Sequence, residues 1–368
     1  MKILVLKETN PNENRVAISD EVVGKYCKIG FEVFIEKNAG IKSAISNEMF
    51  EKAGAKIVEN ISLILPQTDF IIATQRIDFD YSLCKAGVIF IALLNPYFNQ
   101  HKIAEIAKYD ISVFALELIP RITRAQAMDV LSSQTNLAGY RAVIDGCYEI
   151  NKATPMMMTA GGTISPAKFL IIGAGVAGLQ AIATAKRLGA VVSAFDVRSS
   201  AKEQVESLGA KFIEIKTTQK QDGVYAQELS DQDKALQKQL LFDTIKTQDV
   251  VISSALIPGK KAPILITKEM VNNMKQGSVI IDLSAANGGN CEFTKQGEVI
   301  EINGVKIIGY ENFPSRIAVD ASKMLAKNIF NFIELFVDKQ NKTISIDNSD
   351  EIIKNTLIAY KKIITNIK

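Results

Sequence analysis

Short apolar runs alternate with amphipathic segments through the first third of the chain. The runs predict strands, since apolar stretches of this length bounded by polar residues are typical of buried strands; they cover residues 3–6, 31–35, 71–74, 88–94 and 112–116. Residues 21–29 and 47–53 carry helical spacing, and Gly30 and Gly54 follow them as expected for helix C-terminal caps. Strands alternating with helices predict a parallel α/β sheet.

A second strand and helix series begins near the middle of the chain. A long helix is expected over 132–148 as the bridge between domains, followed by a loop over 151–162. The strands of the second series are expected over 169–172, 191–195, 211–215, 250–253, 278–282 and 306–308. A helix over 317–336 is expected to return to the first domain, and helix and strand interpretations compete for the tail 343–368.

The pattern therefore predicts two Rossmann-like, doubly wound parallel-sheet domains with a cleft between them. The N-terminal domain would hold 1–135 plus 317–368, and the second domain 136–316. The length of 368 residues agrees with two domains, because single cores rarely exceed about 250–300 residues.

Composition excludes several classes of partner. A net charge of +3 on 43 basic and 40 acidic residues is too even for a nucleic-acid stripe or a polybasic membrane patch. The four cysteines (Cys27, Cys84, Cys147 and Cys291) lie far apart without a Cys-x-x-Cys pair, so we expect buried, reduced thiols and no metal site. The apolar run at 3–6 is too short for a signal peptide, which predicts a cytosolic protein.

A dinucleotide fingerprint follows the strand expected at 169–172. Gly173, Gly175 and Gly178 form a G-x-G-x-x-G pattern that opens a helix running to about residue 188. In that context the first glycine permits the tight turn, the second lets the backbone approach a pyrophosphate, and the third allows close packing of helix on strand. The helix N-terminus supplies free N–H groups for the phosphates.

An acidic residue at the end of the next strand selects the cofactor. Asp196 lies 18 residues after Gly178, close to the spacing expected for the acid that accepts from the ribose 2′-hydroxyl. A carboxylate there repels a 2′-phosphate, so NAD(H) is favoured over NADP(H). With Asp196 in place, Arg198 is expected to contact the adenosine region or solvent.

The segment 121–134 is dense in hydrogen-bonding groups where apolar residues would suffice. Interpreted as a helix, it places Gln126, Asp129 and Ser132 on one face, with Arg121 within reach at its start. Spacing alone also permits an ordinary solvated helix start.

Together with the Gly173 fingerprint and the segment 255–260, this block resembles the NAD(H)-binding subunit of proton-translocating NAD(P) transhydrogenases, in the alanine dehydrogenase/transhydrogenase family. The resemblance runs from about residue 7 to 342 and includes the stretches 14–17, 136–142, 277–283 and 288–291. It implies that Arg121, Gln126 and Asp129 are the catalytic residues that place the nicotinamide.

The resemblance also implies a set of NAD(H) contacts. They are Arg121, Gln126, Ala127, Met128, Asp129, Ser132, Gly173, Gly175, Val176, Gly178, Asp196, Val197, Arg198, Gly223, Tyr225, Gln237 and Leu256. Tyr225 would ride on a loop that closes over the dinucleotide. Val224 stands where the family usually has a second glycine, so the chain departs from the family pattern at this position of the loop.

Alanine dehydrogenases share the same fold and need an acid and a base, because amine oxidation moves a proton with the hydride. The family's catalytic lysine falls at Ala73 and its catalytic histidine at Asn95, neither of which can titrate near neutral pH. The only histidine, His101, is expected at the surface. Arg15 stands where the dehydrogenases would bind a substrate carboxylate, and here a structural pairing or an ancestral remnant is expected. Hydride exchange between two nicotinamides needs no such group, so transhydrogenation is favoured.

The sequence thus predicts one half of a proton-translocating, re/si-specific NAD(P)⁺ transhydrogenase. Partner subunits would supply the NADP(H) site and the proton-conducting membrane helices, and a peripheral cytoplasmic homodimer without nucleic acid or a membrane span of its own is expected. The alternatives are an alanine dehydrogenase-like NAD-dependent amino-acid oxidoreductase and a non-catalytic NAD-sensing module.

Overall fold

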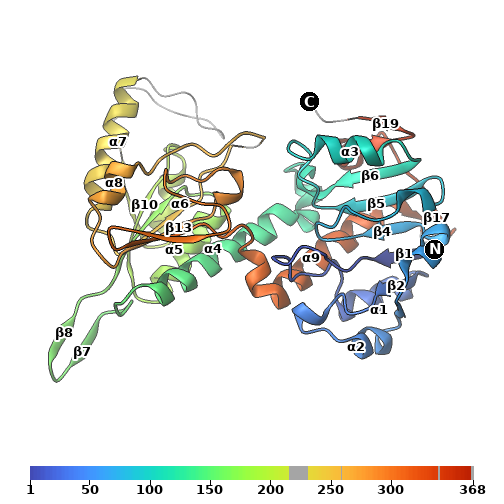
Figure 1. The fold of residues 1–368 in the computed structure, drawn as a ribbon, viewed down its shortest axis with the longest axis horizontal. Coiled ribbons are helices and arrows are strands. Elements are labelled where there is room, and N and C mark those ends of the chain that lie inside the picture. The colour runs from blue at the N-terminus through green and yellow to red at the C-terminus, as the bar shows by residue number, and fades with distance from the viewer. Residues whose placement is uncertain (215–230, 258, 339, 366–368) are drawn as a thin grey trace. The chain divides into compact units, whose positions relative to one another are not determined.

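The structure, a computed structural model, describes residues 1–214, 231–257, 259–338 and 340–365. The chain divides into two compact units, drawn in Figure 1: the first holds Met1–Gln134 and Pro314–Lys368, and the second holds Thr135–Phe313. The chain re-enters the first unit at Pro314, close to the residue 317 expected from the sequence.

The first unit is built on an eight-stranded sheet in the order β19-β18-β6-β5-β4-β1-β2-β3. Its six parallel strands are β1 (Lys2–Val5), β2 (Glu32–Glu36), β3 (Lys56–Val58), β4 (Phe70–Ile72), β5 (Val88–Ala92) and β6 (Ile111–Ala115). The order 3-2-1-4-5-6 is that of a doubly wound Rossmann sheet. The unassigned tail completes the sheet, because β18 (Leu357–Tyr360) pairs antiparallel with β6, and β19 (Ile363–Ile364) pairs with β18.

Helices cover both faces of this sheet. Successive side chains of a strand point to opposite faces, and accordingly Ile3 packs into the core under α1 (Asp20–Lys28) and α9 (Ala318–Ile333), whereas Leu4 packs into the core under α3 (Gln100–Ile106). The short helices α2 (Asn47–Lys52) and α10 (Glu351–Thr356) complete the unit. Gly30 and Gly54 follow α1 and α2 with φ of +90° and +108°, as expected for glycine caps.

The second unit holds a seven-stranded sheet in the order β11-β10-β9-β12-β13-β15-β14. Its strands are β9 (Lys168–Ile172), β10 (Val191–Phe195), β11 (Lys211–Phe212), β12 (Val250–Ser253), β13 (Val279–Asp282), β14 (Val299–Ile302) and β15 (Val305–Ile308), of which only β14 is antiparallel. Its helices are α5 (Val176–Arg187), α6 (Ala201–Ser207), α7 (Asp231–Ile245) and α8 (Lys268–Asn272). The six parallel strands repeat the 3-2-1-4-5-6 order, which confirms the expected fold class.

The bridging helix α4 (Val130–Glu149) packs on α5 through a glycine. A Cβ atom on Gly139 would lie 2.1 Å from the carbonyl oxygen of Ala177, so only glycine lets the two helices approach this closely. This contact ties α4 to the helix that carries the dinucleotide fingerprint.

One expectation about local structure was wrong. The segment 151–162 is not a plain loop, because it leads into the hairpin of β7 (Met157–Thr159) and β8 (Gly162–Ile164), which projects from the second unit in Figure 1. His101 lies in α3, and its side chain is exposed, as expected. A small pair of strands, β16 (Val337–Asp338) and β17 (Thr343–Ile344), follows α9.

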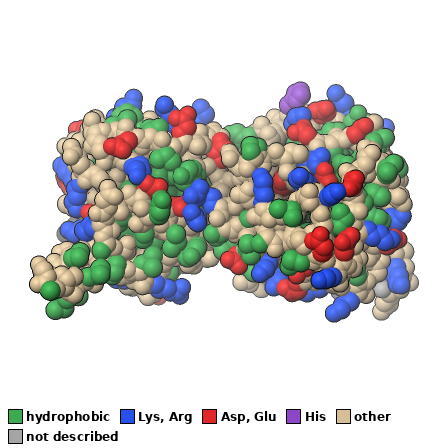
Figure 2. Space-filling model, turned by 60° about the horizontal axis from the view of Figure 1, so that its bottom comes forward, with side chains coloured by type: hydrophobic (Ala, Val, Ile, Leu, Met, Phe, Trp, Pro, Cys, Tyr) green, Lys and Arg blue, Asp and Glu red, His purple; other side chains and the backbone are tan. Residues whose placement is uncertain are grey.

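The surface is mixed in charge. Basic and acidic side chains alternate over the face shown in Figure 2 without forming a large patch of one sign. Among the described residues, no helix is both long and apolar enough to cross a membrane. All four cysteines are free thiols; Cys291 is buried, but Cys27, Cys84 and Cys147 are partly exposed, contrary to the expectation that all four are buried.

Candidate dinucleotide site and polar segment

The glycine turn between β9 and α5 gives each glycine a different environment. Gly173 has φ of +97°, and a Cβ there would lie 2.9 Å from the hydroxyl oxygen of Ser254. A Cβ on Gly178 would lie 1.8 Å from the carbonyl oxygen of Gly173, whereas one on Gly175 meets nothing within 4 Å. The turn therefore requires glycine at 173 and 178 for its own geometry, while Gly175 leaves open space above the backbone.

The start of α5 suits an anion. Gly175 is its N-cap, and no side chain caps the helix, so the first N–H groups keep their hydrogen-bonding capacity for a ligand. The twelve-residue helix adds the partial positive charge of its N-terminus. Gly175 and Val176 are both exposed here, so a pyrophosphate fits these residues.

Asp196, at the end of β10, is held by four hydrogen bonds. Its Oδ1 accepts from the backbone N–H and Nε of Arg198 at 2.8 and 2.9 Å, and its Oδ2 accepts from Ala174 N at 2.7 Å and from the Arg198 guanidinium at 2.9 Å. Burial raises the pKa of Asp196, but these bonds outweigh it and leave the pKa below its ordinary value. A carboxylate offers about four acceptor positions, so a ribose hydroxyl binds here only when Arg198 releases at least one of them. The expectation for Arg198 did not include this pairing.

The loop after β12 reaches the same carboxyl edge of the sheet. Leu256 is 47% exposed there, although it is a large apolar residue. The fully buried Asn290 holds this loop by three hydrogen bonds. Its Oδ1 accepts from Ala255 N at 3.1 Å, and its Nδ2 donates to the carbonyl oxygens of Ala255 and Pro263 at 2.9 and 2.8 Å. Asp282 in turn accepts from the backbone N–H of Asn290 at 2.7 Å. Sequence reasoning gave Asn290 no role, although its stretch 288–291 was part of the resemblance.

Some expected contacts cannot be placed. Gly223 and Tyr225 lie outside the described residues, as does Val224. Only the backbone of Gln237, within α7, is described. Val197 is partly exposed beside Asp196. The other expected contacts of the second unit, Gly173 to Gly178, Asp196 to Arg198 and Leu256, all follow the carboxyl ends of β9, β10 and β12, where ligands bind in open α/β sheets.

The segment 121–134, in the first unit, is not the single helix that its spacing predicted. A 3₁₀ helix, η6 (Thr123–Met128), ends at Asp129, whose φ of −69° and ψ of 88° are not helical. Asp129 instead caps α4, since its carboxylate accepts from the backbone N–H of Ser132 at 2.8 Å and from its hydroxyl at 2.5 Å. Gln126 and Asp129 therefore do not share one helical face.

The exposed side of this segment is polar and open. Arg121, Gln126 and Ala127 are exposed, whereas Met128 is 7% exposed and packs into the core. No described residue makes a hydrogen bond to the side chain of Arg121 or Gln126. These two groups keep their donors and acceptor for a ligand.

Arg15 is committed to a structural pairing, as expected. It is 3% exposed, donates from Nε and a terminal nitrogen to the two carboxylate oxygens of Glu13 at 2.8 and 2.6 Å, and donates to Gln134 Oε1 at 2.8 Å. Its donors on both sides of the guanidinium are thus used within the protein.

Two titratable carboxyls at the carboxyl edge of the first sheet were missed by sequence reasoning. Burial and the nearby Glu13 raise the pKa of Glu8 to about 7, against backbone hydrogen bonds from Gln75 and Thr74 and the charge of Arg15. Burial also raises the pKa of Glu117 to about 7. Each has one buried carboxylate oxygen without a hydrogen-bond partner. The fold reveals this burial, because Glu8 lies between Lys7 and Thr9 in the sequence and nothing there marks it as buried.

The two positions that matter for a dehydrogenase lie beside these carboxyls. Ala73 is fully buried directly after β4, and the backbone N–H of Asn95, after β5, donates to Glu117 Oε1. Asn95 itself has φ of 46°, a left-handed conformation that asparagine tolerates better than most residues. Neither side chain titrates near neutral pH.

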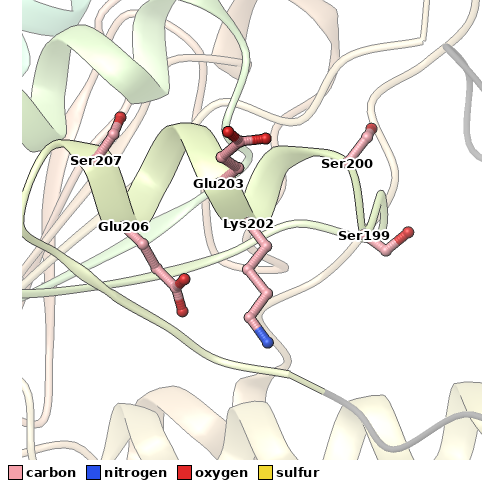
Figure 3. Close-up of a pocket in the computed structure, with 6 residues that line it drawn as sticks. All are labelled: Ser199, Ser200, Lys202, Glu203, Glu206 and Ser207. Atoms are coloured by element: carbon pink, nitrogen blue, oxygen red, sulfur yellow. The ribbon is translucent and has the colours of Figure 1, made fainter.

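A shallow hollow of about 540 Å³ beside α6 is unrelated to this arrangement. Figure 3 shows its lining, which consists of Ser199, Ser200, Lys202, Glu203, Glu206 and Ser207. None of these residues is an expected dinucleotide contact.

Comparisons with known proteins agree with this architecture. Residues 4–138 match the family model "Alanine dehydrogenase/PNT, N-terminal domain" and residues 142–367 match "Alanine dehydrogenase/PNT, C-terminal domain". The chain is 48% identical to an NAD(P) transhydrogenase subunit alpha chain of Rhodospirillum rubrum, over 97% of this chain and 96% of that protein. It is 29% identical to alanine dehydrogenase 1 of Staphylococcus aureus, over 100% and 95%. Its fold is similar to the crystal structure of transhydrogenase from Sinorhizobium meliloti, with a TM-score of 0.91 and 45% identity over 99% of this chain and all of that one.

Proposed function

The chain belongs to the alanine dehydrogenase/PNT family, and we propose that it is the NAD(H)-binding subunit of a proton-translocating NAD(P) transhydrogenase of the re/si-specific type. In this role it exchanges hydride directly with NADP(H) held by a partner subunit. The 48% identity to a transhydrogenase subunit against 29% to an alanine dehydrogenase supports this choice within the family.

The observation that carries the proposal is the pair of non-titrating residues at the carboxyl edge of the first sheet. The resemblance to alanine dehydrogenases implies that their catalytic lysine and histidine would fall at positions 73 and 95, where this chain has Ala73 and Asn95. Arg15 is locked by Glu13 and Gln134, so it has no free fork to hold a substrate carboxylate. Without a lysine and a histidine at these two positions, the site suits hydride exchange between two rings, in which no other proton moves.

The chain's own residues would hold and aim the dinucleotide. When bound, NAD(H) supplies or receives the hydride. The N-terminus of α5 and the open backbone at Gly175 would hold the pyrophosphate, and Asp196 would accept from the adenosine ribose. Arg121, Gln126 and Asp129, with the neighbouring Ala127, Met128 and Ser132, would place the nicotinamide end, because the exposed Arg121 and Gln126 side chains are available to a ligand.

The remaining steps fall to partners. The R. rubrum relative is named as an alpha subunit of a transhydrogenase, and we assign the NADP(H) site and proton translocation to further, membrane-embedded subunits. The chain would then sit on the cytoplasmic face of the inner membrane through these partners.

We also propose a homodimer, supported by exposed apolar side chains on one projecting element of the second unit. On the β7–β8 hairpin Met156 is 60% and Met158 82% exposed, and Tyr148, near the end of α4, is 84% exposed. Apolar side chains gather on this hairpin in Figure 2. Contiguous exposed apolar residues of this kind mark interaction surfaces.

One observation favours a second candidate function, an alanine dehydrogenase-like oxidoreductase. Glu8 and Glu117, with pKa values raised to about 7, are carboxyls that exchange protons near neutral pH. They lie beside the positions of the missing lysine and histidine.

A direct comparison of substrates separates the two functions. The purified chain is assayed with NAD⁺ and alanine, and with NADH, pyruvate and ammonia. In parallel it is mixed with an NADP(H)-binding transhydrogenase subunit, NADPH as the hydride donor and an NAD⁺ analogue of shifted absorbance as the acceptor. We expect turnover only in the nucleotide mixture. Appreciable alanine oxidation, with nucleotide exchange absent, would reverse the assignment.

A further inference from the structure

The η6 segment that would aim the nicotinamide does not hold itself in place. It is a six-residue 3₁₀ helix without a side-chain cap at its start, and only Ala125 and Met128 are buried. A 3₁₀ helix this short has poor hydrogen-bond geometry and little stability of its own. Its position therefore depends on contacts from elsewhere in the fold.

Two asparagines of α9 supply those contacts at one atom. The carbonyl oxygen of Ala127 accepts from Nδ2 of Asn328 at 2.8 Å and from Nδ2 of Asn331 at 3.0 Å. The two residues are three apart in one helix and so project from the same face. The two hydrogen bonds use both lone pairs of this carbonyl oxygen and so fix the orientation of the Ala127 carbonyl. Ala127 lies directly after Gln126 and two residues before Asp129.

Asn328 also reaches the helix on the other side of the segment. Its Oδ1 accepts from the hydroxyl of Ser133, in α4, at 2.7 Å, and the side chain is 8% exposed. It therefore links α9, η6 and α4 through one buried amide. Burying an amide is costly unless its groups are hydrogen-bonded. The buried α9 residues Leu325 and Ile329 are apolar, so packing alone would not require an asparagine at position 328.

A further contact holds the segment near its start. Arg124 donates to both carboxylate oxygens of Asp350 at 2.7 and 2.9 Å, and Asp350 also caps α10. The Arg124 side chain is 52% exposed, so this ion pair contributes less than the buried asparagine. None of these anchors uses the side chains of Arg121 or Gln126.

We propose that Asn328, assisted by Asn331, is a positioning residue for hydride transfer: it fixes the Ala127 carbonyl and thereby the direction in which Gln126 and Asp129 face the nicotinamide. This rests on the proposed transhydrogenase function. Because a misplacement of about 1 Å can lower a rate about 100-fold, loss of the anchor affects transfer far more than adhesion of the dinucleotide, which is held at the glycine turn.

The test uses the full chain and four variants. Asn328→Leu keeps the approximate volume and removes both hydrogen bonds; Asn328→Asp keeps the acceptor for Ser133 and removes the amide donor. Asn331→Ala removes the second donor from a half-buried position, and it remains usable should Asn328→Leu fold poorly. Asn355→Ala is the matched control, because Asn355 is an exposed asparagine of the same unit that donates only to Glu351 within α10.

Two readouts are compared. Hydrogen exchange of a peptide covering 122–129 reports the anchor itself, and we expect about fivefold faster exchange in the Asn328 variants, the effect of one lost hydrogen bond on local opening. The NADH Kd and the rate of hydride transfer to an NADP(H)-binding partner subunit report the function. We expect transfer to fall about 10- to 100-fold, the NADH Kd to change less than about threefold, and Asn355→Ala to match wild type.

The outcomes separate the two ideas. Unchanged exchange and transfer in both Asn328 variants, or equal losses of affinity and transfer, would overturn the positioning role. If the wild-type chain transfers no hydride but the Asn328 variants still show faster hydrogen exchange, the anchoring role of Asn328 stands and only the proposed function is refuted.

Discussion

Two glycines of one turn have opposite predicted consequences when a methyl group is added. Gly175 has φ of −79°, a value that any residue adopts, and its added Cβ meets nothing within 4 Å. Gly178 would place the same atom 1.8 Å from the backbone carbonyl of Gly173. Gly175→Ala therefore tests the ligand, and Gly178→Ala tests the packing of helix on strand.

The magnitudes follow from these distances. Gly175→Ala should change the free energy of unfolding by less than about 1 kcal/mol, but crowding a pyrophosphate at that point costs about 1–3 kcal/mol, which weakens NADH binding about 5- to 140-fold. Gly178→Ala collides with backbone that cannot rotate away, so it should cost about 3 kcal/mol or more. In a unit of this size that is a loss of about 6–12 °C in Tm.

The assay combines calorimetric unfolding with NADH titration followed by the fluorescence of the bound nucleotide. We expect Gly175→Ala to keep the wild-type Tm and to bind NADH more weakly. For Gly178→Ala we expect a lower Tm as the main effect. Wild-type affinity in a folded Gly175→Ala protein would show that the pyrophosphate does not lie over this backbone, and the assignment of the site would be wrong.

Three further predictions concern charge and assembly. Asp196→Asn should weaken NADH binding by about 1.5–3 kcal/mol and raise the relative affinity for NADPH, because Arg198 is freed from its partner; titration with both nucleotides checks this, and an unchanged ratio contradicts it. Glu8 and Glu117 have pKa values of about 7, above the ordinary 4.5. Between pH 4.5 and 7 the folded chain therefore binds more protons than the unfolded chain, so the free energy of unfolding falls as the pH rises through this interval. The loss is at most about 3 kcal/mol for each group. Glu8→Gln should therefore gain stability over wild type at pH 8 but not at pH 4.5, measured by denaturant unfolding, and an equal difference at both pH values refutes the burial argument. If the chain forms the proposed homodimer, Met158→Asp should convert it to a monomer in light scattering, and an unchanged dimer mass excludes the hairpin from the interface.

The parallel sheets could be predicted from the sequence because their strands are fully buried. Such strands are continuous apolar runs, and β10 and β12 occur over the expected residues. The strands β3 and β14 were not predicted; both lie at sheet edges and contain no buried residue, so they lack the apolar run of a buried strand. The hairpin at 157–164 was also not predicted. Its strands contain no buried residue, because their apolar side chains are exposed and pack on no core.

The polar segment shows the limit of periodicity. The spacing of Gln126, Asp129 and Ser132 fits a helix, but Asp129 competes for the backbone by capping the next helix, and this local hydrogen bond divides the segment in two. Asn328 and Glu8 act through partners that are distant in sequence. Their burial and hydrogen bonds depend on which strands and helices become neighbours, and the sequence pattern around them does not contain that information.

Isotope tracing is the most direct test of hydride exchange between NAD(H) and a second nucleotide. NADH carrying deuterium at the transferred C4 position is mixed with the full chain, an NADP(H)-binding partner subunit and NADP⁺ in ordinary water, and the NADPH formed is analysed by mass spectrometry. We predict that the NADPH carries the deuterium, because in direct transfer no group of the protein exchanges the hydride with solvent. NADPH formed without the label, or no NADPH from a chain that binds NADH normally, would contradict it.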